Sequence, residues 1–325
     1  MARARAWARV ALMLLPLPAL VLHIPLWIEQ LSSIEYPIHP RGIVVITGAS
    51  SGIGRHAALA LDLGGMTVFA AVRSHEAAAA LLAERPSVRA LVWDVTSQEH
   101  TEAAVDAVRA AMSAEGLPLV GLVNNAGVSH RLPLELDTDE AMRALYEVNV
   151  FGAVRATRAF LPLLRESRGR VVFVSSLAAL LPHPGAAAYS GSKAAIELTA
   201  DVLRLELEPW RVSVSVVEPG YVRTGIAAKQ VGAAARARTH PFAELYSDFV
   251  GSQDARRLQM EGKADSPLVT SSAIAHALAA PRPRTRYVVA NVNGVPAWAY
   301  GWLAWLLPDR LQDRVVLRAW RQPVV

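Results

Sequence analysis

Residues 42–54 read Gly-Ile-Val-Val-Ile-Thr-Gly-Ala-Ser-Ser-Gly-Ile-Gly, and the fold class can be inferred outward from them. The apolar run 42–46 predicts a buried strand, and the alanine- and leucine-rich residues 55–63 predict a helix that ends at Gly64. Between them, glycines permit a tight turn and a close backbone approach, and the helix N-terminus offers N–H groups to a pyrophosphate. This context predicts a dinucleotide cradle formed by Thr47, Gly48, Ser50, Ser51, Gly52, Ile53 and Gly54.

The rest of the chain alternates strand and helix patterns. Further strands are predicted at 67–72, 90–93, 119–123, 171–174, 212–217 and 285–290. Helices are predicted at 98–115, at 138–165 with a break at Pro162, and at 268–280, and a further helix contains Tyr189 and ends at about Glu208. This alternation predicts an α/β fold, a doubly wound parallel sheet of Rossmann type, in one domain over 42–290. Ligands bind at the carboxyl ends of such strands, where the sequence places Arg73, Asp94, Val95, Asn125, Ala126, Gly127, Ser176, Pro219 and Gly220.

Tyr189 and Lys193 are four residues apart on a predicted helix and therefore share one face. A phenol has a pKa near 10 and is a poor acid–base group at neutral pH, but a nearby ammonium stabilises the phenolate. Ser176, at a strand end, can converge with them and hold a substrate oxygen. Tyrosine and lysine at this spacing also occur as an ordinary surface pair, so the pattern gains weight only from the rest of the chain.

The end of the second strand bears on the choice of cofactor. An NAD site usually has a carboxylate there for the ribose hydroxyls, but this chain has Val72 followed by Arg73. Arg73 could pair with a 2′-phosphate, which favours NADP(H) over NAD(H). The alternative is that Arg73 is a solvated loop residue. Asp94 could accept a hydrogen bond from the adenine amine.

Composition excludes several classes of protein. The net charge of the 325 residues is +5, but no basic stripe interleaved with aromatic residues is present, so we expect no nucleic-acid partner. Cysteine is absent, which excludes disulfides and thiol catalysis. The nine histidines show no ligand spacing, so no metal site is expected.

Residues 1–30 predict a membrane anchor. The uncharged stretch 10–28 would span roughly 28 Å as a helix, about one hydrocarbon core. Arg3, Arg5 and Arg9 precede it, and three prolines interrupt it. A cleaved signal peptide is the alternative, and a kinked helix lying in the membrane plane is another. The expected location is the endoplasmic reticulum membrane in a eukaryote or the inner membrane in a bacterium.

With these residues in place, the chain resembles the short-chain dehydrogenase/reductase family over 42–290. The motifs are TGASSGIG at 47–54, NNAG at 124–127, Asn149, Ser176 with Tyr189 and Lys193, and Pro-Gly at 219–220. Ser176 lies thirteen residues before Tyr189, the usual family spacing, and is therefore preferred to Ser175. An N-terminal anchor, Ala-Val-Arg-Ser at 71–74 and Thr-Arg-Tyr at 285–287 make the chain similar to membrane-associated retinol and hydroxysteroid dehydrogenases.

The resemblance implies roles for the matched residues. Tyr189 would be the general acid/base, Lys193 would bind the nicotinamide ribose and lower the tyrosine pKa, and Ser176 would orient the substrate oxygen. Asn149 would hold a relay water, although a buried hydrogen-bonding role is equally open. Val222 and Thr224 would meet the nicotinamide end of the cofactor. Homodimers or homotetramers are common in the family.

The last third of the chain carries the least pattern. By the resemblance, about 225–267 would form a substrate lid, with candidate walls at Ile226, Val231, Phe242, Leu245, Tyr246 and Phe249. Residues 291–325 are rich in tryptophan, which suits a membrane interface, or alternatively packing against the domain or a second subunit.

The sequence thus predicts an NAD(P)-dependent oxidoreductase that interconverts a hydrophobic alcohol and its ketone or aldehyde, of steroid, retinoid or lipid class. A long-chain lipid ketone reductase is the enzymatic alternative. The alternative of another class is a membrane-anchored nucleotide-binding protein without turnover.

Overall fold

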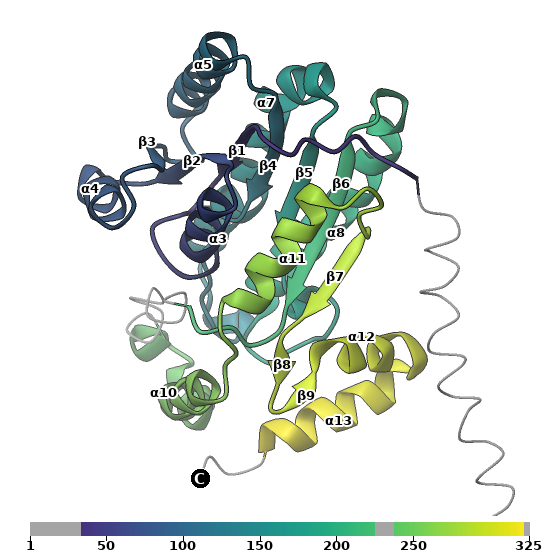
Figure 1. The fold of residues 1–325 in the computed structure, drawn as a ribbon. Helices are drawn as coiled ribbons and strands as arrows, with labels where there is room; N and C mark the ends of the chain where they lie inside the picture. Colours follow the sequence, from purple (N-terminus) through teal and green to yellow (C-terminus); the bar gives the residue numbers. More distant parts are fainter. Residues whose placement is uncertain (1–33, 225–236, 322–325) are drawn as a thin grey trace, which may run out of the picture.

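The computed structural model describes residues 34–224 and 237–321 and is built on one parallel seven-stranded sheet. The strand order is β3-β2-β1-β4-β5-β6-β7 (Figure 1). The strands are β1 Ile43–Ile46, β2 Thr67–Val72, β3 Arg89–Val92, β4 Leu119–Asn124, β5 Arg170–Val174, β6 Ser213–Pro219 and β7 Arg286–Val289. All seven agree with the sequence prediction to within about two residues. The central strands β1, β4 and β5 are largely apolar and fully buried, as expected of parallel strands covered on both faces, whereas the edge strands β3 and β7 are only partly buried.

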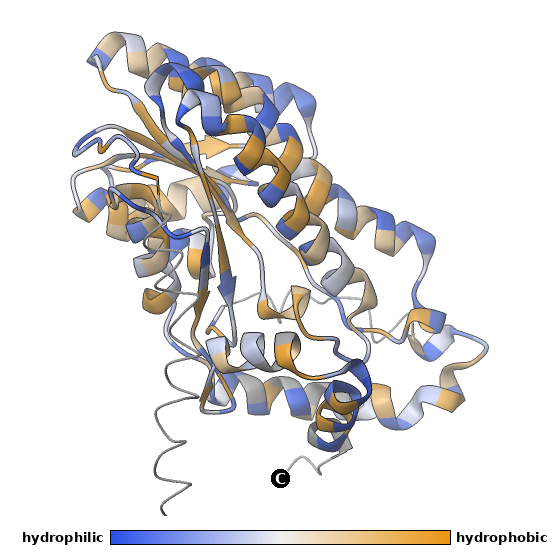
Figure 2. Cartoon of the chain, turned by 90° about the vertical axis from the view of Figure 1, so that its right-hand side faces the viewer, coloured by the Kyte–Doolittle hydropathy of each residue, from blue (hydrophilic) through white to orange (hydrophobic). Residues whose placement is uncertain are grey.

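Helices cover both faces of the sheet. On one face lie α3 Gly52–Leu63, α4 His75–Glu84 and α11 Leu268–Ala279; on the other lie α5 Gln98–Glu115, α7 Ala153–Ser167 and α8 Ala187–Leu207. Figure 2 shows apolar residues concentrated along the sheet and on the helix surfaces that meet it. Two separate hydrophobic cores result, one for each face, as a doubly wound sheet requires.

The predicted helix over 138–165 is interrupted at a different place from the one expected. It consists of α6 Asp139–Tyr146, a π-helical turn η2 Glu147–Gly152, and α7, which continues through Pro162. Pro162 lies on the exposed side of α7, where water can bond the carbonyl that proline leaves without its N–H partner. The break at Pro162 was therefore wrong, and the interruption lies at the turn that carries Asn149.

Several elements of the last third had no sequence prediction. They are the short 3-10 turn η5 Ala243–Tyr246, α10 Ser247–Gly262, the hairpin strands β8 Asn291–Val292 and β9 Val295–Pro296, α12 Ala297–Leu306 and α13 Asp309–Arg321. Figure 1 places α12 and α13 side by side beyond the lower end of β7. The Gln312 side chain joins them by donating to Ala304 O at 2.8 Å and Leu307 O at 2.7 Å.

The tail packs against the domain. Ala297, Tyr300 and Ala304 of α12, with Val292, share an apolar cluster with Leu177 and Leu181, which follow β5. Packing was one of the two alternatives for this stretch, and it accounts for the inner face of α12. Trp298 is half-exposed and does not belong to this cluster.

Among the described residues, no helix combines the length and the apolar character needed to cross a bilayer. The predicted anchor at 1–30 lies outside the described residues.

Candidate active site

A cavity of about 450 Å³ opens at the carboxyl ends of the strands. Most of the residues predicted from the sequence line it: Gly48, Ser50, Ser51, Gly52, Ile53, Arg73, Asp94, Val95, Asn125, Ala126, Gly127, Ser176, Tyr189, Lys193, Pro219, Gly220, Val222 and Thr224. Three predicted residues, Thr47, Gly54 and Asn149, do not line it. They lie behind the wall and connect its loops.

The glycine turn packs tightly against the loop that follows β4. Gly48 has φ 69°, and a Cβ at that position would lie 2.7 Å from the Ala126 Cα. Thr47 Oγ1 accepts hydrogen bonds from the backbone N–H groups of Asn125 and Ala126, each at 3.0 Å. Thr47 therefore fixes the relative position of the two loops and does not itself face the cavity.

The start of α3 has the chemistry of a phosphate site. Gly52 has φ 58° and opens the helix, and a Cβ there would lie 2.9 Å from the Thr224 Cβ. The first turn contains no acidic residue, and the N-cap Ser51 makes no side-chain capping bond. The first N–H groups of a helix have no partner within the helix, and its dipole favours an anion. These residues fit a dinucleotide pyrophosphate.

The far end of the cavity holds Arg73 and Asp94. Arg73 directly follows β2 and is exposed. The Asp94 carboxylate accepts from Thr96 N at 2.9 Å and from Thr96 Oγ1 at 2.8 Å. Partial burial opposes ionisation of Asp94, but these hydrogen bonds and the charges of Arg73 and His100 lower its pKa. Asp94 is thus an anchored carboxylate, and Arg73 is the nearby cation.

Ser176, Tyr189 and Lys193 meet at the cavity floor. Ser176 caps the short 3-10 turn η3 Leu177–Ala179, and its side chain is hydrogen-bonded to that of Tyr189. Lys193 lies one turn after Tyr189 on α8, with its Nζ 5.9 Å from the centre of the tyrosine ring. The same Nζ donates to Val174 O at 2.9 Å, which holds the lysine against the end of β5.

Burial dominates the ionisation of this group. It raises the pKa of Tyr189, while the hydrogen bond to Ser176 and the charge of Arg131 act in the opposite direction. Burial lowers the pKa of Lys193 to about 8, against the effect of the Glu197 carboxylate. Burial thus acts on both groups in the same sense, because it disfavours the charged form of the phenol and of the ammonium alike.

Asn149 connects the loop after β4 to α8. Its Oδ1 accepts from Val128 N at 2.8 Å, and its Nδ2 donates to Val128 O and to Ser192 Oγ, both at 3.0 Å. The side chain is buried, and both of its polar atoms are used by the protein. These bonds support the buried hydrogen-bonding role that the sequence left open. Asn149 lies in the π-helical turn η2, which sets the position of its side chain.

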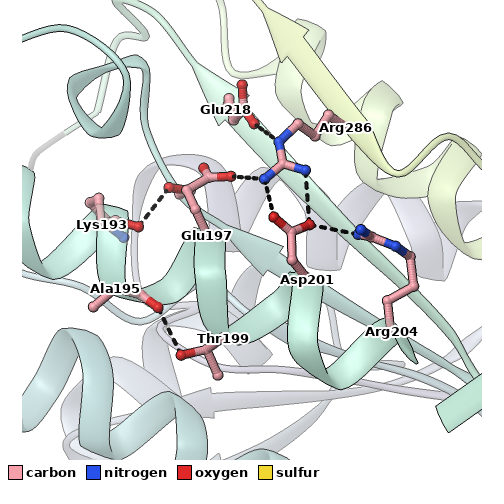
Figure 3. Close-up of polar contacts among 9 residues, drawn as sticks. Lys193, Ala195, Glu197, Thr199, Asp201, Arg204, Glu218 and Arg286 are labelled. Carbon is pink, nitrogen blue, oxygen red and sulfur yellow. Dashed lines mark hydrogen bonds and ion pairs between the residues drawn. The ribbon is translucent and has the colours of Figure 1, made fainter. Parts of the chain in front are cut away.

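A buried charged cluster lies behind Lys193 (Figure 3). Arg286 reaches from β7 to three carboxylates: Asp201 at 2.7 Å, Glu218 at 3.1 Å and Glu197 at 3.2 Å. Burial is the largest cause that raises the pKa of Glu218, to about 8, and the neighbouring Glu197 charge adds to it. Burial also raises the pKa of Glu197. The two buried carboxyls favour sharing one proton while Arg286 neutralises the remaining charge.

A group of apolar and aromatic residues in the cavity wall comes from distant parts of the chain, together with the polar residues Asn293 and Gln312. It includes Leu177 and Leu181 after β5, Tyr221 after β6, and, from the last tenth of the chain, Val292, Tyr300, Val315 and Val316. Of the segment predicted as a lid, Arg256, Gln259, Glu261 and Ala264 contribute.

The individual lid residues chosen from the sequence were mostly wrong. Phe242 and Leu245 are exposed, Tyr246 donates its hydroxyl to Glu135 at 2.7 Å, and Phe249 packs on Gly185. None of these four lines the cavity. Ile226 and Val231 lie outside the described residues. The resemblance placed a lid over this region but could not say which of its side chains turn toward the cavity, and in the structure these four point to solvent or to other partners.

Sequence reasoning also missed Arg131, His183, Tyr221 and Tyr300 in the cavity wall and the Glu197–Glu218–Arg286 cluster. One usable signal was Glu218, an acidic residue directly after the apolar pair Val216–Val217 near the end of β6.

Comparison with known proteins agrees with this geometry. The family model described as short chain dehydrogenase matches residues 42–234. The chain belongs to the short-chain dehydrogenase family. It is an oxidoreductase of CH–OH groups that uses a nicotinamide cofactor.

Individual relatives cover most of the chain. Human 11-beta-hydroxysteroid dehydrogenase type 2 is 34% identical over 83% of this chain and 68% of its own. The NADPH-dependent 3-dehydrocapnine reductase of Ornithobacterium rhinotracheale is 33% identical over 83% and 94%. A short-chain dehydrogenase structure from Streptomyces avermitilis superposes with a TM-score of 0.67 at 31% identity, over 87% and 96%. Solved structures with this fold hold NADP or NAD, so the family does not choose between them.

Proposed function

We propose that this protein is an NADP(H)-dependent, membrane-associated oxidoreductase that interconverts an apolar alcohol and its ketone or aldehyde, of steroid, retinoid or lipid class. The observation that carries the proposal is the meeting of Ser176, Tyr189 and Lys193 at one end of a cavity whose other end has a phosphate-binding helix terminus. The apolar wall and the steroid dehydrogenase relative support the substrate class.

The chain's own residues can perform the proton chemistry. The bound nicotinamide supplies or accepts the hydride. Ser176 Oγ donates a hydrogen bond to the substrate oxygen and holds it beside Tyr189. The Tyr189 hydroxyl gives a proton to that oxygen during reduction and takes it back during oxidation. The Lys193 ammonium stabilises the phenolate that results, and Asn149 keeps the loop beside the cofactor in place.

Tyr189→Phe tests this assignment. The variant keeps the ring but loses the transferable proton, so turnover should fall at least a thousandfold, since positioned proton transfer and substrate orientation are both lost. Cofactor binding should change little. Tyr246→Phe is the matched control, because Tyr246 hydrogen-bonds Glu135 away from the cavity. Cofactor binding with no turnover in the unaltered protein would bring forward the non-catalytic nucleotide-binding alternative.

Arg73 supports the preference for NADP(H). No carboxylate stands at the end of β2, and the Arg73 charge acts on Asp94 at that end of the cavity. Fluorescence titration should give tighter binding of NADPH than of NADH, and Arg73→Ser should remove most of the difference. A preference for NADH in the unaltered protein would contradict this assignment and favour alcohol oxidation.

A long-chain lipid ketone reductase is the second candidate. The apolar wall formed by Val292, Tyr300, Val315 and Val316 can accept an acyl chain, and the 3-dehydrocapnine reductase relative is named for reduction of a ketone. NADPH oxidation with a long-chain ketone and with a steroid ketone would distinguish the two candidates by their kcat/KM.

Association with the membrane and with further subunits belongs to the same proposal. Deletion of residues 1–30 should move the protein from the membrane to the soluble fraction; unchanged fractionation would contradict the anchor. On α8, Leu198 is 67% exposed and Leu205 is 74% exposed, which supports pairing of subunits through this helix. Leu205→Arg should shift the oligomer toward monomer in light scattering.

A further inference from the structure

Arg131 stands out in the substrate end of the cavity. It lies in the loop after β4, beyond the residues that border the cofactor end, and it lines the cavity wall. Among the described residues, Arg131 has neither a hydrogen bond nor an ion pair. The acidic residues nearest to it in sequence are already occupied: Asp137 binds His130 at 2.6 Å, and Glu135 accepts from Tyr246 at 2.7 Å.

Arg131 is half-buried in the wall of the cavity. Its charge acts on Tyr189 of α8, on His183 in the loop after η3, and on Tyr221 after β6, although burial is the larger influence on the pKa of all three. These side chains come from three separate segments and all line the cavity. Arg131 therefore shares the tyrosine end of the cavity wall with these three side chains.

The cofactor does not account for this cation. Arg73 acts on Asp94 at the β2 end of the cavity, whereas Arg131 acts on the tyrosine end. His183 supplies no negative charge; burial lowers its pKa, and its Nδ1 is bonded to Pro182 O at 2.7 Å. Charged residues of both signs, Arg256 and Glu261, line the α10 side of the cavity.

An arginine in a partly desolvated apolar cavity is favourable when a ligand brings the matching anion, and its fork of N–H groups binds carboxylate, sulfonate or phosphate in pairs. We propose that Arg131 binds an acidic group of the substrate, so that the substrate is an amphiphile with an anionic head near its hydroxyl or keto group and an apolar body along Leu181, Val292 and Val315. This inference rests on the proposed function, because it specifies the class of alcohol or ketone that the site accepts.

The test compares an acid with its neutral ester. Binding of decanoate and of methyl decanoate to the full-length protein, saturated with NADPH, is measured by isothermal titration. A charge-assisted pair is worth roughly 10- to 100-fold in affinity, so decanoate should bind at least about tenfold more tightly than the ester. Arg131→Met should remove this preference and Arg131→Lys should keep part of it. Arg223→Met is the control, because Arg223 is exposed and does not line the cavity.

Two results would overturn the proposal. One is equal affinity for acid and ester in the unaltered protein. The other is a preference for the acid that survives Arg131→Met. If that variant then changes only the pH profile of turnover, Arg131 acts on Tyr189 and not on the substrate. Oxidation of 3-hydroxydecanoate and of its methyl ester separates this inference from the proposed function. Preference for the acid in binding with no turnover of either would count against the proposed substrate class and leave the role of Arg131 standing, whereas turnover of both without preference would refute only the role of Arg131.

Discussion

The buried carboxyl pair behind Lys193 makes the stability of this protein depend on pH in a predictable direction. Glu218 has no exposed surface and faces Glu197, and its pKa rises from an ordinary value of 4.5 to about 8 in the folded chain. Between these two values the folded protein holds a proton that the unfolded chain has lost. The contribution of Glu218 to the free energy of unfolding is therefore fully present below about pH 4.5 and is lost as the pH rises toward 8.

The perturbation is Glu218→Gln, which mimics the protonated carboxyl at every pH. The difference in pKa corresponds to at most about 4–5 kcal/mol. Because Glu197 shares the proton and Arg286 stabilises the ionised form, we expect roughly 2 kcal/mol. In a domain of this size that amounts to about 4–8 °C in Tm.

The assay is the melting temperature of variant and unaltered protein from pH 5.5 to 9. The variant should melt close to the unaltered protein at pH 5.5 and about 4–8 °C higher at pH 9. Asp201→Asn is the control. Hydrogen bonds from Arg286 are the largest cause that lowers the Asp201 pKa, so loss of this carboxylate should lower the stability of the folded protein at every pH in this range. A difference between Glu218→Gln and the unaltered protein that stays constant or falls with rising pH would refute the reasoning.

Three further changes have expected outcomes. Arg170→Met removes buried hydrogen bonds to three backbone carbonyls (at 2.6, 2.8 and 2.9 Å) and should lower the stability by roughly 3 kcal/mol, measured as a Tm decrease of about 6–12 °C; an unchanged Tm would contradict it. Gly48→Ala places a Cβ 2.7 Å from the Ala126 backbone at a positive φ and should weaken NADPH binding at least about tenfold by titration, so unimpaired binding would count against the cradle. Gln312→Ala breaks the link between α12 and α13 and should raise KM for an apolar substrate while leaving the NADPH affinity unchanged; a change in the cofactor affinity alone would argue against a substrate wall at this position.

The sheet was predictable because its signals are local. Most of the strands are short apolar runs followed closely by glycine or a polar residue, and the order of strands and helices then determines the fold class. The loops at the strand ends follow from the same pattern, which is why Gly48, Asn125 and Ser176 could be assigned to one edge before the structure was known.

The remainder depends on contacts between distant segments. Helical periodicity does not distinguish an α-helix from the π-helical turn at Glu147–Gly152, so Pro162 was a plausible but wrong break. The contact of Val292 with the Leu177 region, and the position of Arg131 in the cavity, have no counterpart in local sequence.

The origin of the apolar wall has a consequence for engineering. The family model matches residues 42–234, whereas part of the wall comes from 291–321, beyond that match. This part of the wall is therefore separable along the chain from Ser176, Tyr189 and Lys193, whereas Leu177 and Leu181 belong to the matched region. Under the proposed function, a chimera that exchanges residues 291–321 between two relatives should change the relative kcat/KM for different apolar alcohols, so new selectivities become accessible by recombination as well as by point substitution.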